Sequence, residues 1–138
     1  MQLLVWHCAS LVSTTVSPCE GAEVLPKAEI GEPETFDDCL FALVTVQPDD
    51  RAGKCWKAAK GVRTISEHAE TKLVVVNAYA HLGPLNADLS VTRQMLDQFV
   101  TRLDENVGLD VTVLPFGWRK RFQFDVRGHE WAHRSIYV

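Results

Sequence analysis

The 138-residue chain lacks the short motifs that mark the commonest nucleotide-binding and hydrolytic enzymes. It has no Gly-x-Gly-x-x-Gly, no Walker-type phosphate loop, no Gly-x-Ser-x-Gly and no His-Glu-x-x-His. No close pair of carboxylates suggests glycosidase chemistry. Any catalytic site must therefore be assembled from residues that are dispersed along the chain.

Cysteines and long apolar runs are also few. The four cysteines, Cys8, Cys19, Cys39 and Cys55, contain no Cys-x-x-Cys pair, which is unlike a zinc pattern. No apolar stretch reaches the roughly 18 residues of a membrane span, and the apolar start lacks the basic n-region of a signal peptide. We expect reduced thiols in a cytoplasmic protein, or a disulfide if the source is hyperthermophilic.

Charge is divided unevenly along the chain. Residues 1–50 contain nine Asp or Glu and one Lys, whereas residues 51–138 contain nine Asp or Glu and thirteen Lys or Arg. A basic region lies near the C-terminal end and comprises Arg119, Lys120, Arg121, Arg127 and Arg134, together with His129 and His133. Such a region can meet phosphates, but charge alone favours a solvated strand edge. His129 and His133 have metal-ligand spacing, yet no carboxylate or cysteine is placed to complete a site.

Hydrophobic patterning predicts one α/β domain, a mixed β-sheet with helices packed on it. The expected strands are 3–6, 39–46, 73–79, 109–114 and 121–127, and the expected helices are 51–69 and 90–105. We expect Ser90 to cap the second helix, Trp56 to lie in the core, residues 9–33 to form a loop or weak hairpin, and a short helix to begin after Gly128. The chain stops at Val138 as though cut from something longer.

Two segments follow buried strands and then turn polar. They are Ala78-Tyr79-Ala80-His81-Leu82 and Pro115-Phe116-Gly117-Trp118-Arg119-Lys120. Because open α/β sheets place ligands at strand ends, His81 and Lys120 are the first candidates for chemistry. Tyr79 and Trp118 could stack a nucleobase, although aromatic packing is the commoner role. These residues alone do not indicate which reaction the site would catalyse.

In this order and spacing, the two segments resemble the N-terminal editing domain of archaeal threonyl-tRNA synthetases. The match runs from Leu73–Val76 through Ala80-His81-Leu82 and Ser90-Val91 to Pro115-Phe116-Gly117, Lys120 and Gly128-His129, and residues 9–35 are its weak part. The resemblance implies a fold similar to D-aminoacyl-tRNA deacylases, usually a dimer. It also implies hydrolysis of serine wrongly attached to threonine tRNA, which a pocket that must detect one methyl group cannot prevent by binding alone.

The resemblance also assigns roles to residues. Lys120 and His81 would be catalytic, and the substrate would contact Val46, Tyr79, Ala80, Pro115, Phe116, Gly117, Arg119 and His133. The 2′-hydroxyl of the substrate would assist, with no metal or cofactor; ATP and zinc would serve other domains of a full-length synthetase. The expected partners are the 3′ end of tRNA(Thr) carrying serine and a second copy of the chain, not a membrane or DNA. Residues 1–138 would be a single editing domain of a longer synthetase.

Three positions depart from the family pattern. Cys8-Ala9 follow His7 where the family tends to have Ser-Asp, Arg119 replaces an aromatic residue, and His133 replaces a glutamate. Two alternatives stay open: a freestanding D-aminoacyl-tRNA deacylase, and a non-catalytic tRNA-binding or dimerisation module, which Arg119 and His133 keep open.

Overall fold

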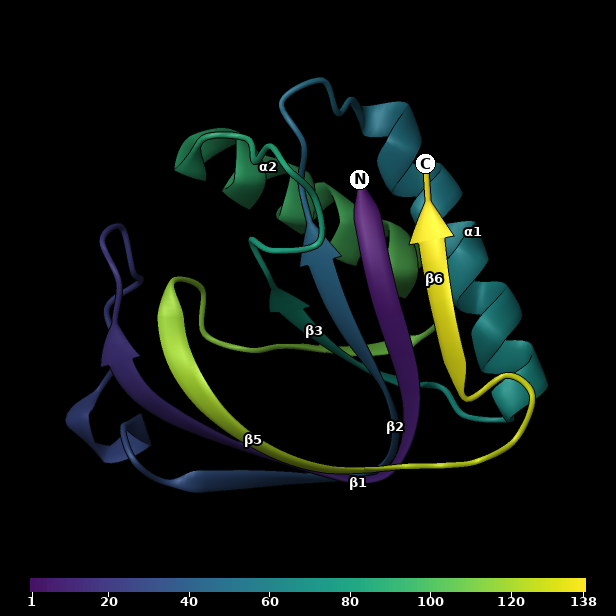
Figure 1. Ribbon diagram of the computed structural model, residues 1–138, viewed down its shortest axis with the longest axis horizontal. Coiled ribbons are helices and arrows are strands. Elements are labelled where there is room, and N and C mark those ends of the chain that lie inside the picture. Colours follow the sequence, from purple (N-terminus) through teal and green to yellow (C-terminus); the bar gives the residue numbers. More distant parts are fainter.

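Apolar, β-branched runs form the inner strands of a six-stranded sheet in the computed structural model, which describes residues 1–138 (Figure 1). In chain order the elements are β1 (Gln2–Pro18), a 3-10 turn (Lys27–Glu29), β2 (Pro33–Thr45), α1 (Ala52–Ala69), β3 (Leu73–Ala78), α2 (Leu89–Thr101) with a π turn (Arg102–Asn106), β4 (Asp110–Val113), β5 (Trp118–Val126) and β6 (His133–Tyr137). The predicted fold class, a mixed sheet with helices packed on it, is confirmed. None of the helices is long and apolar enough to cross a membrane.

The strand order is β4-β3-β2-β1-β5, and β6 also pairs with β1. Strands β2, β3 and β4 run parallel to one another, whereas β1 is antiparallel to all three of its partners. The first part of β1, Gln2–Trp6, pairs with β6, and the part from Cys8 to Pro18 pairs with β5. The register shifts between Cys8 and Ser10, and because such irregularities bend a strand, β1 curves where its partner changes (Figure 1).

The two faces of the sheet carry separate apolar clusters. Both helices cover one face, where the larger cluster packs alternate residues of β1, β2 and β3 against α1 and α2 (Figure 1). No helix covers the other face, where Phe41 packs with Phe122 and Phe124 of β5 at ring distances of 5.0 and 5.6 Å. Alternation along each strand therefore supplies two apolar surfaces, of which only one lies under helices.

The helices correct two expectations. Trp56 is 37% exposed and packs under the Lys60 ammonium group at 5.4 Å, so its prediction as a core residue was wrong. The buried face of α1 contains Cys55, Ala59 and Val62 instead. Asp88, not Ser90, caps α2, because its carboxylate accepts the N–H of Val91 at 2.9 Å.

Residues 9–18 and the C-terminal segment also differ from expectation. The stretch Ala9–Pro18 continues β1 between β2 and β5, and its Ser13 and Thr15 are buried there. Small polar residues indicated a loop, but the β-branched residues among them suit a central strand. After Gly128 the chain forms a turn and then strand β6, not a helix, so His129 and His133 do not share a helical face.

Candidate active site

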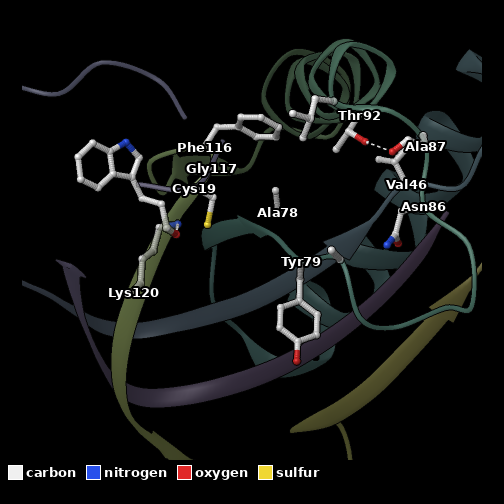
Figure 2. Close-up of a pocket in the computed structure, with 13 residues that line it drawn as sticks. Cys19, Val46, Ala78, Tyr79, Asn86, Ala87, Thr92, Phe116, Gly117 and Lys120 are labelled. Atoms are coloured by element: carbon white, nitrogen blue, oxygen red, sulfur yellow. Dashed lines mark hydrogen bonds between the residues drawn. The ribbon is translucent and has the colours of Figure 1, made fainter. Parts of the chain in front are cut away.

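The C-terminal ends of β2, β3 and β4 meet at one edge of the sheet because the three strands are parallel. A cavity of about 340 Å³ lies at this edge, between the segments that follow β2 and β3, the turn before β5 and the start of α2 (Figure 2). It is lined by Cys19, Val46, Ala78, Tyr79, Ala80, Asn86, Ala87, Leu89, Thr92, Phe116, Gly117, Trp118 and Lys120. The lining is mostly apolar with a few polar groups, as is usual for small-molecule sites.

Six of the predicted site residues line this cavity. They are Val46, Tyr79, Ala80, Phe116, Gly117 and Lys120. The two segments singled out in the sequence thus face one another across one space, with the Tyr79 side on one wall and the Phe116–Lys120 side on another (Figure 2). Their roles in substrate binding and catalysis stay predictions.

The four other predicted residues do not line the cavity. Pro115 lies directly before the lining residue Phe116, and His81 is exposed with its ring 5.3 Å from that of Tyr79. Arg119 is exposed and its guanidinium donates to the carbonyl of Pro18 at 3.3 Å. His133 lies at the start of β6, where Nε2 donates to the carbonyl of Arg127 at 3.1 Å.

Lys120 is the ionisable group most strongly affected by this environment. Burial lowers the pKa of Lys120 to about 8, against the opposing effects of Glu23 and Cys19, which act to raise it. Its Nζ donates to the carbonyl of Trp118 at 2.9 Å. A lysine with a pKa of about 8 carries its charge at neutral pH yet can release a proton readily, which suits it to stabilise an oxyanion or to transfer a proton.

Thr45, at the end of β2, holds the wall that carries Tyr79 and Ala80. The Tyr79 N–H donates to the carbonyl of Val44 at 2.8 Å, and the Thr45 hydroxyl donates to the Tyr79 carbonyl. The same hydroxyl accepts the N–H of Leu82 at 3.4 Å. Since Thr45 is only 1% exposed, these bonds have no competing water, and they fix the loop that leads to His81.

The turn Phe116-Gly117 forms the facing wall and depends on glycine. Gly117 has φ +78°, and a Cβ at this position would lie 2.6 Å from Cα of Ala22. The segment Cys19–Glu23 packs against this turn: Cys19 N–H donates to the Gly117 carbonyl at 2.8 Å and Glu23 N–H to the Phe116 carbonyl at 3.1 Å. Only glycine combines this backbone conformation with so close an approach.

A second polar cluster lies away from the cavity, around His7. Its Nδ1 is 2.6 Å from Nε2 of His129, and its Nε2 is 2.8 Å from a carboxylate oxygen of Asp38. Nδ1 of His129 accepts the Trp131 N–H at 3.2 Å. Nε2 of His129 therefore donates to Nδ1 of His7, and Nε2 of His7 donates to Asp38. His7 is 4% exposed, and this network ties the turn after β5 to β1.

Several residues of the site carried no signal that sequence reasoning detected. Cys19 reaches the cavity only because β1 extends to Pro18, and Asn86, Ala87, Leu89 and Thr92 reach it because α2 begins beside the ends of the strands. Glu23 and Arg93 support the Phe116 wall from behind. The one available signal was Asp88, whose spacing before Val91 fits an N-cap and would have placed the start of α2.

Comparison with known proteins gives a consistent result. Residues 1–137 match the model of the archaea-specific editing domain of threonyl-tRNA synthetase. The chain is 26% identical to a threonine–tRNA ligase of Nitrosopumilus maritimus over 100% of the chain and 21% of the ligase. It is 33% identical to that of Thermofilum pendens over 73% of the chain and 17% of the ligase. The chain thus spans about a fifth of the length of these curated relatives.

Solved structures show the same fold. A c-Myc DNA unwinding element binding protein superposes with a TM-score of 0.73 at 9% identity, covering 100% of this chain and 99% of the other. A structure described as a probable eukaryotic D-amino acid tRNA deacylase superposes with a TM-score of 0.62 at 11% identity, covering 98% of each chain. At these identities the likeness shows the fold alone.

The family match defines the class of an aminoacyl-tRNA deacylase, a hydrolase that edits charged tRNA, and the fold agrees with it. Within that class, the chain belongs to the archaea-specific editing domain family of threonyl-tRNA synthetase.

Proposed function

We propose that this domain removes serine from mischarged seryl-tRNA(Thr) by hydrolysis of the aminoacyl ester. The observation that supports this most directly is the cavity at the strand ends, which is lined by Tyr79, Ala80, Phe116, Gly117 and Lys120. Its volume of about 340 Å³ lies at the small end of the range for ligand sites, which suits the end of a tRNA carrying a small amino acid.

In the proposed reaction, water attacks the ester carbonyl carbon, the bond to the ribose oxygen breaks, and that oxygen takes up the proton that the water loses. The Lys120 ammonium group stabilises the negative charge that develops on the carbonyl oxygen. The N–H of Gly117 has no acceptor among the backbone and side-chain hydrogen bonds of the chain, so it is free to donate to the same oxygen. The 2′-hydroxyl of the substrate orients the water, and His81 contacts the aminoacyl group from the margin of the cavity.

The test is deacylation of Ser-tRNA(Thr), Thr-tRNA(Thr) and a D-seryl-tRNA by the 138-residue protein. We expect release of L-serine, with Thr-tRNA spared because its extra methyl group does not fit. Lys120→Ala should reduce the rate, and a 2′-deoxy terminal adenosine should react more slowly than the ribose form. Preference for D-serine would replace the proposal with a D-aminoacyl-tRNA deacylase, and no release above buffer would leave a non-catalytic tRNA-binding module.

We also propose that the protein acts in the cytoplasm, as a homodimer, on the 3′ end of tRNA(Thr). The sheet face without helices supports the dimer, because Phe124 there is 40% exposed and stacks on Trp6 at 5.2 Å. Exposed aromatic surface of this kind commonly marks a protein interface. Light scattering coupled to gel filtration measures the mass, and a monomer at micromolar concentration would contradict this part.

A further inference from the structure

The segment Cys19–Glu23 follows directly on β1 and leads toward the 3-10 turn at Lys27–Glu29. In the structure it lies directly behind the Phe116-Gly117 wall of the cavity and makes most of the contacts that hold that wall. A wall of an active site that is held by a neighbouring segment depends on the residues that join the two. Glu23 makes more of these joining contacts, through its side chain and its backbone, than any other residue of the segment.

Glu23 joins three elements through its carboxylate and its backbone. One carboxylate oxygen, Oε1, accepts the Phe116 N–H at 3.1 Å, and the other, Oε2, accepts from the Arg93 guanidinium of α2 at 3.1 Å. Its backbone carbonyl accepts the indole N–H of Trp118 at 2.7 Å. Arg93 in turn stacks over the Phe116 ring at 5.1 Å. The Glu23 carboxylate and the Arg93 guanidinium therefore join the turn to α2.

These contacts decide which backbone donors of the turn remain available. The Phe116 N–H is taken by Glu23, and the Phe116 and Gly117 carbonyls are taken by the N–H groups of Glu23 and Cys19. Of the two N–H groups of this turn, only that of Gly117 has no acceptor within the chain, and Gly117 lines the cavity. Trp118, whose carbonyl accepts from Lys120, is fixed by the same segment.

We propose that Glu23 is a positioning residue of the deacylation site, which holds the Phe116-Gly117 turn and the Trp118–Lys120 segment in their reactive arrangement without touching the substrate. The proposal rests on the proposed function, since it names a residue that supports the same site. Its carboxylate lies on the far side of the wall and is absent from the cavity lining. A displacement of about 1 Å in such a wall is enough to lower a rate by roughly 100-fold.

Three variants separate positioning from general stability. Glu23→Gln keeps the side-chain volume and an oxygen for the Phe116 N–H but loses the charge. Glu23→Ala loses both, and Arg93→Met loses the ion pair and the contact with the Phe116 ring. Glu20→Gln is the matched control, because Glu20 is an exposed glutamate of the same region with no ion pair. Thermal unfolding of every variant establishes that it is folded.

The first readout is the division between kcat and KM for Ser-tRNA(Thr). We expect Glu23→Ala to lower kcat by roughly 10- to 100-fold while KM changes by less than about threefold. Glu23→Gln should lower kcat several-fold, and Glu20→Gln should match the wild type. The double variant Glu23→Ala/Arg93→Met should lower kcat by less than the product of the two single reductions. Wild-type kcat in both Glu23 variants, or a loss confined to KM, would overturn the proposal.

The second readout is independent of activity. Because the carboxylate of Glu23 acts to raise the pKa of Lys120, Glu23→Gln should move that pKa below its value of about 8. NMR titration of carbon-13-labelled lysine measures this directly, and the Phe116 and Gly117 amide signals report the turn. If the wild-type protein releases no serine, the proposed function fails, while these signals still test the positioning role. An unmoved Lys120 titration together with unmoved Phe116 and Gly117 amide signals in Glu23→Gln would refute it.

Discussion

Replacing Lys120 by methionine should make the protein more stable at neutral pH and inactive as a deacylase. Lys120 is largely buried at the cavity, and burial lowers its pKa from 10.5 to about 8. A depressed lysine pKa means that the folded state disfavours the charged form that the unfolded chain carries freely. Methionine has a similar length and no charge, so the substitution removes the unfavourable interaction and keeps most of the packing.

The expected gain in the free energy of unfolding follows from the difference between the two pKa values of Lys120, in the unfolded chain and in the folded protein. Each pKa unit corresponds to about 1.36 kcal/mol, so the charged lysine costs the folded state about 3 kcal/mol. Loss of the Lys120–Trp118 hydrogen bond offsets roughly 1 kcal/mol of this. We therefore expect the free energy of unfolding to rise by roughly 1–2 kcal/mol, or about 5 °C in Tm for a domain of this size.

The pH dependence of stability is an independent test of whether the charged Lys120 destabilises the folded protein. Between pH 8 and 10.5 the unfolded wild-type chain binds more protons at Lys120 than the folded protein does, so wild-type stability rises with pH across this window. The advantage of the methionine variant should therefore be complete below pH 8 and disappear by about pH 10.5.

Urea unfolding of both proteins at pH 7, 9 and 10.5 tests this, with the difference between them as the measured quantity so that other titrating groups cancel. Lys57→Met, at an exposed position of α1, is the matched control for the loss of one lysine side chain. A variant equal in stability to the wild type at pH 7, or a difference that does not change with pH, would refute the reasoning. An active Lys120→Met protein would remove Lys120 from catalysis.

Three further substitutions test the walls of the site and the His7 cluster. Thr45→Val keeps the shape but removes the hydroxyl that bonds to Tyr79 and Leu82, so it should lower the free energy of unfolding by about 1–3 kcal/mol and lower the deacylation rate. Thr45→Ser should keep the stability and the deacylation rate of the wild type. Equal urea midpoints for the wild type and Thr45→Val would contradict this. Gly117→Ala should destabilise the protein in thermal unfolding by about 1–3 kcal/mol more than Gly108→Ala, because both positions have positive φ but only Gly117 would also contact Ala22. Burial acts to raise the pKa of Asp38, but His7 and Arg127 hold it below its usual value of 3.8. Asp38→Asn should therefore lower the free energy of unfolding at pH 7 by at most about 1 kcal/mol, and this difference from the wild type should vanish as the pH falls below the pKa of Asp38. A difference that grows in acid would contradict this prediction.

The inner strands and the two helices could be predicted because their pattern is strong. The continuous run of valines at Val74–Val76 predicts a buried strand, and it lies in β3. Gly108 takes the left-handed conformation that its position after α2 predicts. The prediction for residues 9–18 was wrong because Ser and Thr suit loops as well as strands, and only pairing with β2 and β5 decides between them. Strand β6 was missed for a similar reason, since its partner lies more than 120 residues earlier in the chain.

The error at residues 9–18 had a consequence for the site. A strand that ends at Pro18 brings Cys19–Glu23 beside the turn before β5, whereas a loose hairpin would leave the position of this segment undetermined. The walls that carry Tyr79 and Lys120 could be predicted from strand ends alone. The support behind the second wall could not be, because it depends on a contact between residues 23 and 116, which no local pattern signals.

The departures from the family pattern acquire a physical interpretation from this arrangement. Arg119 and His133 are two positions at which the resemblance implies a departure from the family pattern, and in this structure neither lines the cavity. The walls are held through backbone groups, by Thr45 on the Tyr79 side and by Glu23 on the Phe116 side. A site built in this way tolerates change at positions that face away from it. Substitution at Thr45 or Glu23 should therefore reduce deacylation more than restoring an aromatic residue at Arg119 or a glutamate at His133 would increase it.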